Sequence, residues 1–304
     1  MEAVMKNTRI DPRLRENISY FLFLLPTIAF FGAVIVYPMF DSLILSFQHW
    51  DGTLHGVRTW AGLENYRTLF FHNPIFLVSL RNNVVYTAMF LFVINFFCLV
   101  FAMLLNQPRK GRNVFRAFTY LPNAISGVSV ALIWRWIFNM QFGLLNETLN
   151  TIGLGALASD WLGDLSFAFS SIIVAGGWQS IGAGIIFFLA GLQTIPLEIY
   201  EAARIDGANR VQSFFRITIP LLKETFVIVV TLTIITTMRV YDIVFALTWG
   251  GPARRTNVLS TLMYFESFVF GNFTQGAAIA WVLFLVIAVF AIPYVLAMSK
   301  NDIY

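Results

Sequence analysis

The sequence is poor in charged residues, cysteine and histidine. Charged residues form 12% of its 304 positions, about half the usual share in soluble domains. Apolar residues form 58%, which excludes a disordered chain and disfavours an ordinary soluble enzyme. The single Cys98 cannot form an internal disulfide, and the three histidines lack metal-ligand spacing. The net charge of +4 bears on membrane topology more than on nucleic acid, so no nucleic-acid partner is expected.

Six mostly apolar windows are long enough to cross a lipid bilayer, which takes about 20 residues. Unpaired backbone groups cannot face lipid, so each window is predicted to be a helix. The first is longer than the apolar core of a signal peptide and is expected to remain as an anchor. The fold class is therefore an all-α polytopic membrane protein with six transmembrane helices. The predicted spans are residues 20–46, 84–105, 117–138, 168–192, 226–247 and 277–298.

Lys and Arg are unevenly distributed between the two sides of these spans. Thirteen lie in the N-terminal segment 1–19, the second and fourth connections and the C-terminal tail, against five on the other side. Because positive loops stay inside, both termini are predicted to be cytoplasmic. The first connection, residues 47–83, is then an extracytoplasmic loop, in which residues 62–71 predict a short surface helix.

The fourth connection has the pattern of two short helices around a glycine. Pro196 suits a first helical position, with Thr194 as the N-cap. Gly207 supplies the freedom for a sharp turn, and Asn209 can cap a second helix that Pro220 ends. The small side chains around the turn would let another protein approach closely.

This connection resembles the E-A-A loop of binding-protein-dependent ABC importer permeases. The family motif is E-A-A, three residues, G, nine residues and I-x-L-P; the sequence departs from it at Ile219, which replaces Leu. The resemblance implies a coupling helix that docks in a groove of an ATPase, within the loop 194–220. The residues expected to couple are Glu201, Ala202, Ala203, Asp206, Gly207, Ala208, Ile217 and Pro220.

The resemblance extends over most of the chain. The segments RAFTYLPNAISGVSVALIWRWIFN, FFLAGLQTIPLEIYEAARIDGA and LTWGGP look like the carbohydrate-uptake branch, and among its members like the MalF/UgpA type of subunit. This implies an ABC importer type I transmembrane domain over residues 80–298, in a multi-pass protein of the bacterial inner membrane. It also implies a heterodimer with a second homologous permease, a dimer of cytoplasmic ABC ATPases and an extracytoplasmic solute-binding protein.

The sequence has no phosphate-binding loop of the form G-x-x-x-x-G-K-[ST]. It also has no soluble stretch long enough for an ATPase domain. We therefore expect no enzymatic activity, cofactor or metal in this chain, with ATP and Mg²⁺ bound by the partner ATPase.

Polar residues within the predicted spans are candidates for the translocation pathway, because their burial in lipid is costly. An aromatic ring among amides and hydroxyls suits a sugar. The candidates are Asn123, Ser126, Trp178, Gln179, Ser180, Thr233, Thr237, Arg239, Tyr241 and Asp242. The alternative for the small residues is ordinary helix packing, and for Arg239 and Asp242 an ion pair on one helix face.

Three interpretations of the substrate and energy source remain open. A neutral oligosaccharide is the first choice; glycerol-3-phosphate or another anionic solute is the second, with Arg239 as the obvious cation. An ion-coupled secondary transporter is the remote alternative, because the five predicted spans from residue 84 onward contain one carboxylate, Asp242, and the sequence shows no inverted repeat.

Overall fold

The computed structural model describes residues 12–53, 55–107 and 110–299, most of which are helical. The first part contains α1 (Pro12–Phe31), the π-helical turn η1 (Gly32–Val36), α2 (Tyr37–Leu45), β1 (Gln48–His49), β2 (Thr59–Trp60), α3 (Glu64–His72), α4 (Pro74–Met89), the π-helical turn η2 (Phe90–Ile94) and α5 (Asn95–Asn106). The middle contains α6 (Arg112–Ala124), α7 (Gly127–Ile137), α8 (Leu144–Thr151), the 3₁₀ turn η3 (Gly155–Leu157) and α9 (Ala168–Thr194). The last part contains α10 (Leu197–Ile205), α11 (Arg210–Ser213), the π-helical turn η4 (Phe214–Thr218), α12 (Ile219–Leu221), α13 (Lys223–Met238), α14 (Asp242–Thr248), α15 (Leu259–Tyr264), the π-helical turn η5 (Phe265–Val269) and α16 (Phe273–Ser299).

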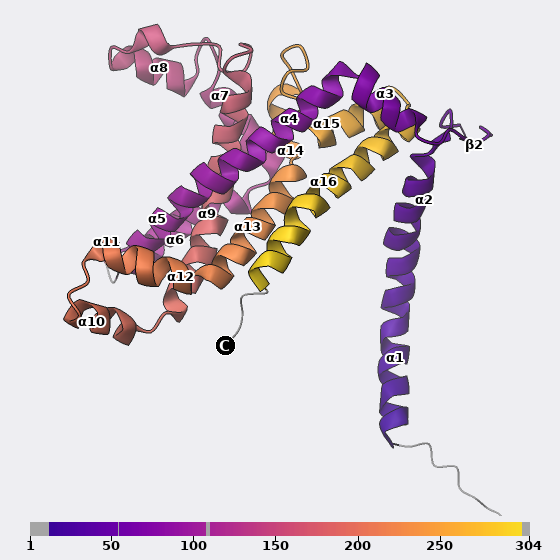
Figure 1. Cartoon of the computed structure of the whole chain (residues 1–304). Coiled ribbons are helices and arrows are strands. Elements are labelled where there is room, and N and C mark those ends of the chain that lie inside the picture. The colour runs from indigo at the N-terminus through magenta and orange to yellow at the C-terminus, as the bar shows by residue number, and fades with distance from the viewer. Residues whose placement is uncertain (1–11, 54, 108–109, 300–304) are drawn as a thin grey trace, which may run out of the picture.

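The first span is a rod formed by α1, η1 and α2, and it stands apart from the other helices (Figure 1). It joins them near its upper end in this view, through the strands β1 and β2 and helix α3. The apolar window within Tyr20–Leu45 has no residue buried inside the chain. Such a helix requires lipid or another protein around it.

Four helical stretches are long and apolar enough to cross a membrane: Tyr20–Leu45, Pro74–Asn106, Ala168–Thr194 and Phe273–Met298. Two more reach that length only as bent pairs. Helices α6 and α7 meet at 100°, and α11–α12 meets α13 at 68°. The described residues thus hold four such helices, or six if each bent pair is one span, and the count of six stays a prediction.

The prediction of a single helix over residues 117–138 is wrong, because the chain bends between α6 and α7. Ile125 has extended backbone angles, and the Ser126 hydroxyl caps α7 by accepting the Ser129 N–H. The Ile125 carbonyl, released from helical pairing, accepts a hydrogen bond of 3.0 Å from the Gln179 side chain on α9. A side chain from another helix thus satisfies the broken end.

The prediction of a single helix over residues 226–247 is also wrong, because α13 ends at Met238 and α14 begins at Asp242. Asn83 of α4 donates to the Met238 carbonyl at 2.8 Å and accepts the Leu259 N–H at 2.7 Å. The bond to Met238 replaces the helical pairing that α13 gives up, and the bond from Leu259 pairs an N–H at the start of α15.

The second span begins at Pro74, ten residues before the predicted position 84. Asn73 caps it by accepting the N–H groups of Ile75 and Phe76. Polar residues in the first turns of α4 kept this start out of the predicted apolar window. One of them, buried Asn82, donates hydrogen bonds to the carbonyls of Arg255 and Asn257 and is therefore paired within the protein. The predicted loop 47–83 therefore contains α3, as expected, and the first turns of α4.

Three apolar clusters hold the bundle together. One joins α7, α9 and α14; a second joins α3, α4, α13, α15 and α16; a third joins α5, α9 and α13. Gly182 permits the close approach of α9 to α6, because a Cβ there would meet the Thr119 backbone. The first and third clusters include residues of α9, which has half of its apolar window buried.

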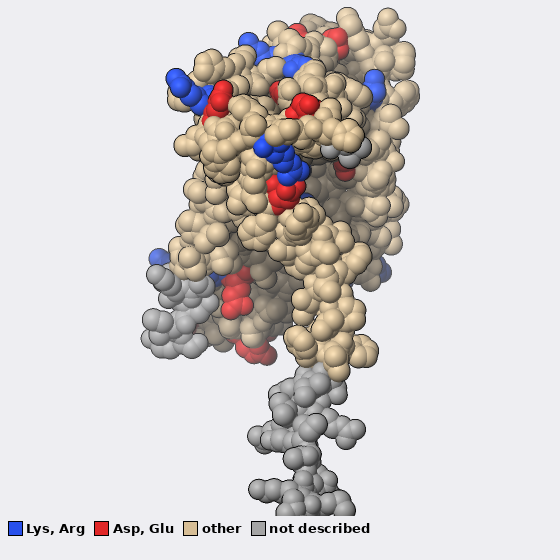
Figure 2. Space-filling view, turned by 90° about the vertical axis from the view of Figure 1, so that its right-hand side faces the viewer, with Lys and Arg blue, Asp and Glu red and all other residues tan. Residues whose placement is uncertain are grey.

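The connections fall at two opposite ends of the bundle (Figure 1). Helices α10 and α11 lie at the lower end of this view, where α1 begins and α16 finishes; we name it the α10 end. Helices α3 and α8 and the strand β2 lie at the upper end, which we name the α3 end. In Figure 2 most charged side chains of the visible face gather in its upper part and a few near its lower part, with an uncharged band between them. This distribution suits a bilayer around the band.

Candidate functional site

A central cavity of about 280 Å³ lies where α13 gives way to α14. Helices α4, α7, α9, α13 and α14 and the turn η2 form its walls. A π-helical turn such as η2 is often found beside functional sites. The central cavity is lined by six of the predicted pathway residues: Gln179, Ser180, Thr237, Arg239, Tyr241 and Asp242.

An adjoining cavity of about 260 Å³ shares Phe90, Ser180 and Thr236 with the central cavity. It is lined in addition by the predicted residues Asn123 and Thr233. Its other walls come from α5, α9 and α13. Because the two cavities share lining residues, they form neighbouring parts of one hollow in the bundle.

Two predicted pathway residues line neither cavity. Ser126 is the cap of α7, and Trp178 packs edge-on against Trp134 with ring centroids 5.9 Å apart. Ser126 thus stabilises the start of α7, and Trp178 packs α9 against α7.

Many of the cavity hydroxyls are engaged within the protein. Ser180 donates to the Gly176 carbonyl at 2.9 Å, and buried Thr237 donates to the Thr233 carbonyl at 2.6 Å. The Thr237 hydroxyl also lies 2.9 Å from the hydroxyl of Thr87. Such bonds are the common state of hydroxyls in membrane helices, so these groups shape the wall as well as offering lone pairs.

The two charges of the central cavity are exposed and separate. Arg239 and Asp242 flank the break between α13 and α14, and no ion pair within the described residues joins them. The predicted pairing on one helix face is wrong, because the helix stops before it could align them. Both side chains are thus open to a ligand, with the ring of Tyr241 between them in the sequence.

The proposed pathway residues leave out three polar residues of this hollow. Asn95 donates to the Thr233 hydroxyl at 3.2 Å, and Thr236 lies on the border of the two cavities. Tyr86 lines the central cavity from α4. Asn95 and Thr236 could have been found by the same signal as the others, since each is polar inside an apolar window.

The E-A-A loop lies at the α10 end and forms the expected pair of helices around Gly207. Gly207 has φ of +80°, which favours glycine. Asn209 caps α11 as predicted, accepting the Gln212 N–H at 2.8 Å while the Gln212 side chain accepts the Asn209 N–H at 2.9 Å. The hydroxyls of Tyr200 and Thr218 are 3.0 Å apart and tie α10 to η4.

Two details of the loop differ from the prediction. Thr194 is the last residue of α9 and donates to Gly191, so it is no cap, and Pro196 itself takes the N-cap position of α10. Pro220 does not end the second helix, which continues through η4 to Leu221. A π-helical turn precedes this proline, where an altered hydrogen-bond register tolerates its missing N–H.

The predicted coupling residues divide by exposure. Ala203 is buried inside the loop, and Ala208, whose N–H pairs with the Ala203 carbonyl, is half-buried together with Ile217. The remaining residues are exposed: Glu201, Ala202, Asp206, Gly207 and Pro220. Ile205 beside them is 86% exposed and Leu197 is 67% exposed, which marks an apolar surface suited to another protein.

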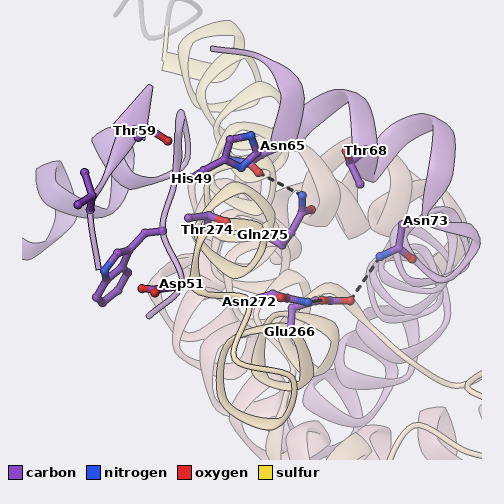
Figure 3. A pocket seen from close by; sticks show the side chains of 12 residues that line it. His49, Asp51, Thr59, Asn65, Thr68, Asn73, Glu266, Asn272, Thr274 and Gln275 are labelled. Carbon is purple, nitrogen blue, oxygen red and sulfur yellow. Dashed lines mark hydrogen bonds between the residues drawn. The ribbon is translucent and has the colours of Figure 1, made fainter. Parts of the chain in front are cut away.

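A third cavity, of about 520 Å³, lies at the α3 end (Figure 3). It has two carboxylates, Asp51 and Glu266, and no Lys or Arg occurs among the described residues that line it. A hydrogen bond from the Thr53 N–H lowers the pKa of Asp51 and keeps it charged. The sequence analysis did not predict this cavity, because its residues come from connections far apart in the chain.

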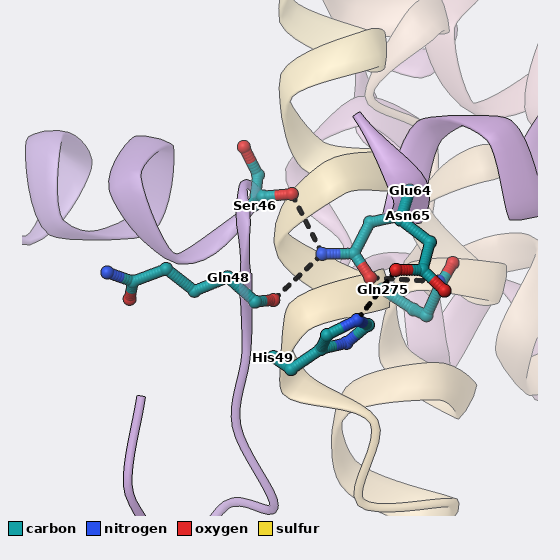
Figure 4. Close-up of polar contacts among 6 residues, drawn as sticks. All are labelled: Ser46, Gln48, His49, Glu64, Asn65 and Gln275. Carbon is teal, nitrogen blue, oxygen red and sulfur yellow. Dashed lines mark hydrogen bonds and ion pairs between the residues drawn. The ribbon is translucent and has the colours of Figure 1, made fainter. Parts of the chain in front are cut away.

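Buried Asn65 ties the first span to the rest of the molecule beside this cavity (Figure 4). Its amide donates to the carbonyls of Ser46 and Gln48, each at 2.9 Å, and its Oδ1 accepts from Gln275 at 3.2 Å. His49 and Glu64 pair nearby at 3.0 Å. These bonds attach the upper end of the α1–α2 rod to the bundle. No residue of the rod's apolar window is buried inside the chain.

Comparison with known proteins identifies the type of molecule. The chain is 37% identical to the probable ABC transporter permease protein YurN of Bacillus subtilis, over 90% of this chain and 93% of that protein. It is 32% identical to the trehalose/maltose transport system permease protein MalF of Thermococcus litoralis, over 94% and 97%. A bacterial ABC transporter that imports the acidic polysaccharide alginate has a chain of the same fold, with a TM-score of 0.84, 23% identity and coverage of 96% and 98%.

The profile of one protein family matches residues 94–299, which include the E-A-A loop and every lining residue of the central and adjoining cavities except Tyr86 and Phe90. The sequence relatives are permease proteins, that is, transport subunits without enzymatic activity of their own. The chain belongs to the inner membrane components of binding-protein-dependent transport systems.

Proposed function

We propose that this chain is the membrane subunit of an ATP-driven sugar importer, in which it forms half of the translocation pathway. The family supports import with a binding protein, and the relative named for trehalose and maltose supports a carbohydrate. The other proposed partners are a second homologous permease, a dimer of cytoplasmic ABC ATPases that bind ATP and Mg²⁺, and an extracytoplasmic solute-binding protein.

The connection between the E-A-A loop and the cavities carries this proposal. Helix α9 lines the central and the adjoining cavity and ends at Thr194, and two residues separate it from the loop helix α10. Helix α13 begins at Lys223, directly after α12, and carries Thr233 and Thr237. A movement of the loop would therefore be transmitted at the same time to α9 and α13, which form two walls of the hollow. In this mechanism, closure of the ATPase dimer moves the loop, and the hollow then switches from inward-facing to outward-facing access.

A neutral oligosaccharide is the proposed substrate. The hollow offers amides from Asn123 and Gln179, hydroxyls and the ring of Tyr241, a combination that suits sugar hydroxyls and C–H faces. Its exposed charges, Arg239 and Asp242, balance each other. Glycerol-3-phosphate or another anionic solute is the second candidate, favoured by the lack of an ion pair on Arg239 among the described residues.

The test is a matched pair of substitutions in the complete importer, reconstituted in liposomes with its binding protein. Gly207 and Gly153 both have φ near +80°, and nothing lies within 4 Å of a Cβ built at either, so Tyr imposes similar backbone strain at both. Gly207→Tyr is expected to reduce ATP-driven uptake at least tenfold, because the ring stands on the proposed ATPase contact. Gly153→Tyr, before η3, is expected to retain uptake. Normal uptake by Gly207→Tyr at equal protein levels would contradict the coupling role.

A further inference from the structure

An unassigned groove lies between the end of α5 and the start of α6. Its volume is about 290 Å³. Four apolar side chains and two cations line it: Phe101, Leu104, Leu105, Phe115, Lys110 and Arg112. Among the described residues, this groove is lined by apolar and cationic side chains and by no amide or hydroxyl, whereas amides and hydroxyls line both cavities of the central hollow. The groove and the hollow share no lining residue.

No carboxylate among the described residues neutralises the positive charge of this groove. The sequence has no Asp or Glu between Glu64 and Glu147. Lys110 and Arg112 are exposed and form no ion pair with any carboxylate in the described ranges. An anionic ligand would therefore meet unopposed cations here.

Arg116, one turn after Arg112 on α6, is a further reason to expect an anion near the groove. Its guanidinium donates to the Leu105 carbonyl at 3.4 Å, and its Nε is buried without a hydrogen-bond partner. A buried N–H without a partner is costly, and a nearby anion would lower that cost. Arg112 and Arg116 on the first turns of α6, with Lys110 just before the helix, thus bring three cations to this end of α6.

The apolar surface of α6 places the groove next to hydrocarbon. Phe118 is 69% exposed and Leu121 is 56% exposed, and both follow Phe115 along the helix. Because α6 is bent by 100° from α7, its basic start and its apolar surface lie on one short amphipathic helix. Such a helix with basic residues is typical of the interface between lipid headgroups and acyl chains.

The geometry points to a binding site for an anionic phospholipid. Its phosphate would lie between Lys110 and Arg112, and one acyl chain along Phe101, Leu104 and Phe115. The two cations give an anionic headgroup a preference over a zwitterionic one, while the apolar wall distinguishes a lipid from a free anion. The groove is at the α10 end, since Leu105 packs in one cluster with Leu192 and Leu222, which flank the E-A-A loop.

The test uses the complete transporter, freed of lipid in detergent and titrated in native mass spectrometry. The probes are dioleoylphosphatidylglycerol, dioleoylphosphatidylcholine and inorganic phosphate. The double variant Lys110→Gln/Arg112→Gln is compared with Arg67→Gln/Arg81→Gln, which removes the same charge from exposed positions on α3 and α4.

Wild type and the control are expected to bind phosphatidylglycerol about tenfold more tightly than phosphatidylcholine, and the Lys110/Arg112 variant to lose that preference. Phe115→Ala should weaken phosphatidylglycerol binding as well. Equal lipid binding by both double variants would overturn the assignment. Unchanged binding by Phe115→Ala, or displacement of the lipid by an equal concentration of inorganic phosphate, would overturn it in favour of a free-anion site.

Discussion

At the residue scale, the chemistry of the central cavity depends on two charged residues, Arg239 and Asp242, which form no ion pair among the described residues. Arg239 lies in the break after α13, where it faces the cavity without an ion pair to Asp242. An arginine in this state can serve as a multiple hydrogen-bond donor to sugar hydroxyls or as the counter-ion of an anionic solute. These roles differ in how strongly they need the positive charge.

Replacing Arg239 by Gln separates the two roles. For a neutral oligosaccharide, uptake by the complete importer is expected to fall by no more than about fivefold, because an amide still donates hydrogen bonds. Arg135→Gln, an exposed arginine of α7 outside both cavities, is the control and should leave uptake unchanged. A loss of about a hundredfold in Arg239→Gln, with the binding protein still loaded, would instead favour an anionic substrate.

At the element scale, hydropathy predicted where helices lie but not where they break. The α6–α7 bend depends on Gln179, which reaches the Ile125 carbonyl from another helix. The α13–α14 break depends on Asn83, more than 150 residues earlier in the chain. Long-range hydrogen bonds of this kind leave no trace in local periodicity. The cap at Asn209 and the turn at Gly207 were predictable because their causes are local.

Replacing Asn83 tests this account of the break. Asn83→Leu removes both of its bonds and leaves the Met238 carbonyl and the Leu259 N–H unpaired and buried, at a cost of about 2–4 kcal/mol. Asn83→Asp keeps the acceptor for Leu259 but loses the donor to Met238. Thermal unfolding of the purified complex should give a lower Tm for both variants than for wild type, because the aspartate adds a buried charge to the lost donor. A Tm for Asn83→Leu equal to that of wild type would contradict the account.

At the scale of the whole molecule, the sequence predicted the lining of the central hollow better than the outer surface. Eight of the ten proposed pathway residues line the central or the adjoining cavity, because polar groups are conspicuous in apolar helices. The cavity at the α3 end escaped prediction, since it is assembled from β1, α3 and the start of α16, whose polar residues look like ordinary loop composition. The exposure of the first span and the proposed lipid groove could not be predicted either, because both depend on how the helices pack.

The central claim is that the E-A-A loop lies on the cytoplasmic side, where an ATPase can push it. Its most direct test is labelling of intact cells with a membrane-impermeant maleimide, after Cys98→Ser removes the one native thiol. Asn209→Cys on the exposed loop and Asn150→Cys on exposed α8 are the two probes, at opposite ends of the bundle. We predict labelling of the Asn150 variant in intact cells, and of the Asn209 variant only after the membrane is opened. Labelling of the Asn209 variant in intact cells would contradict the account.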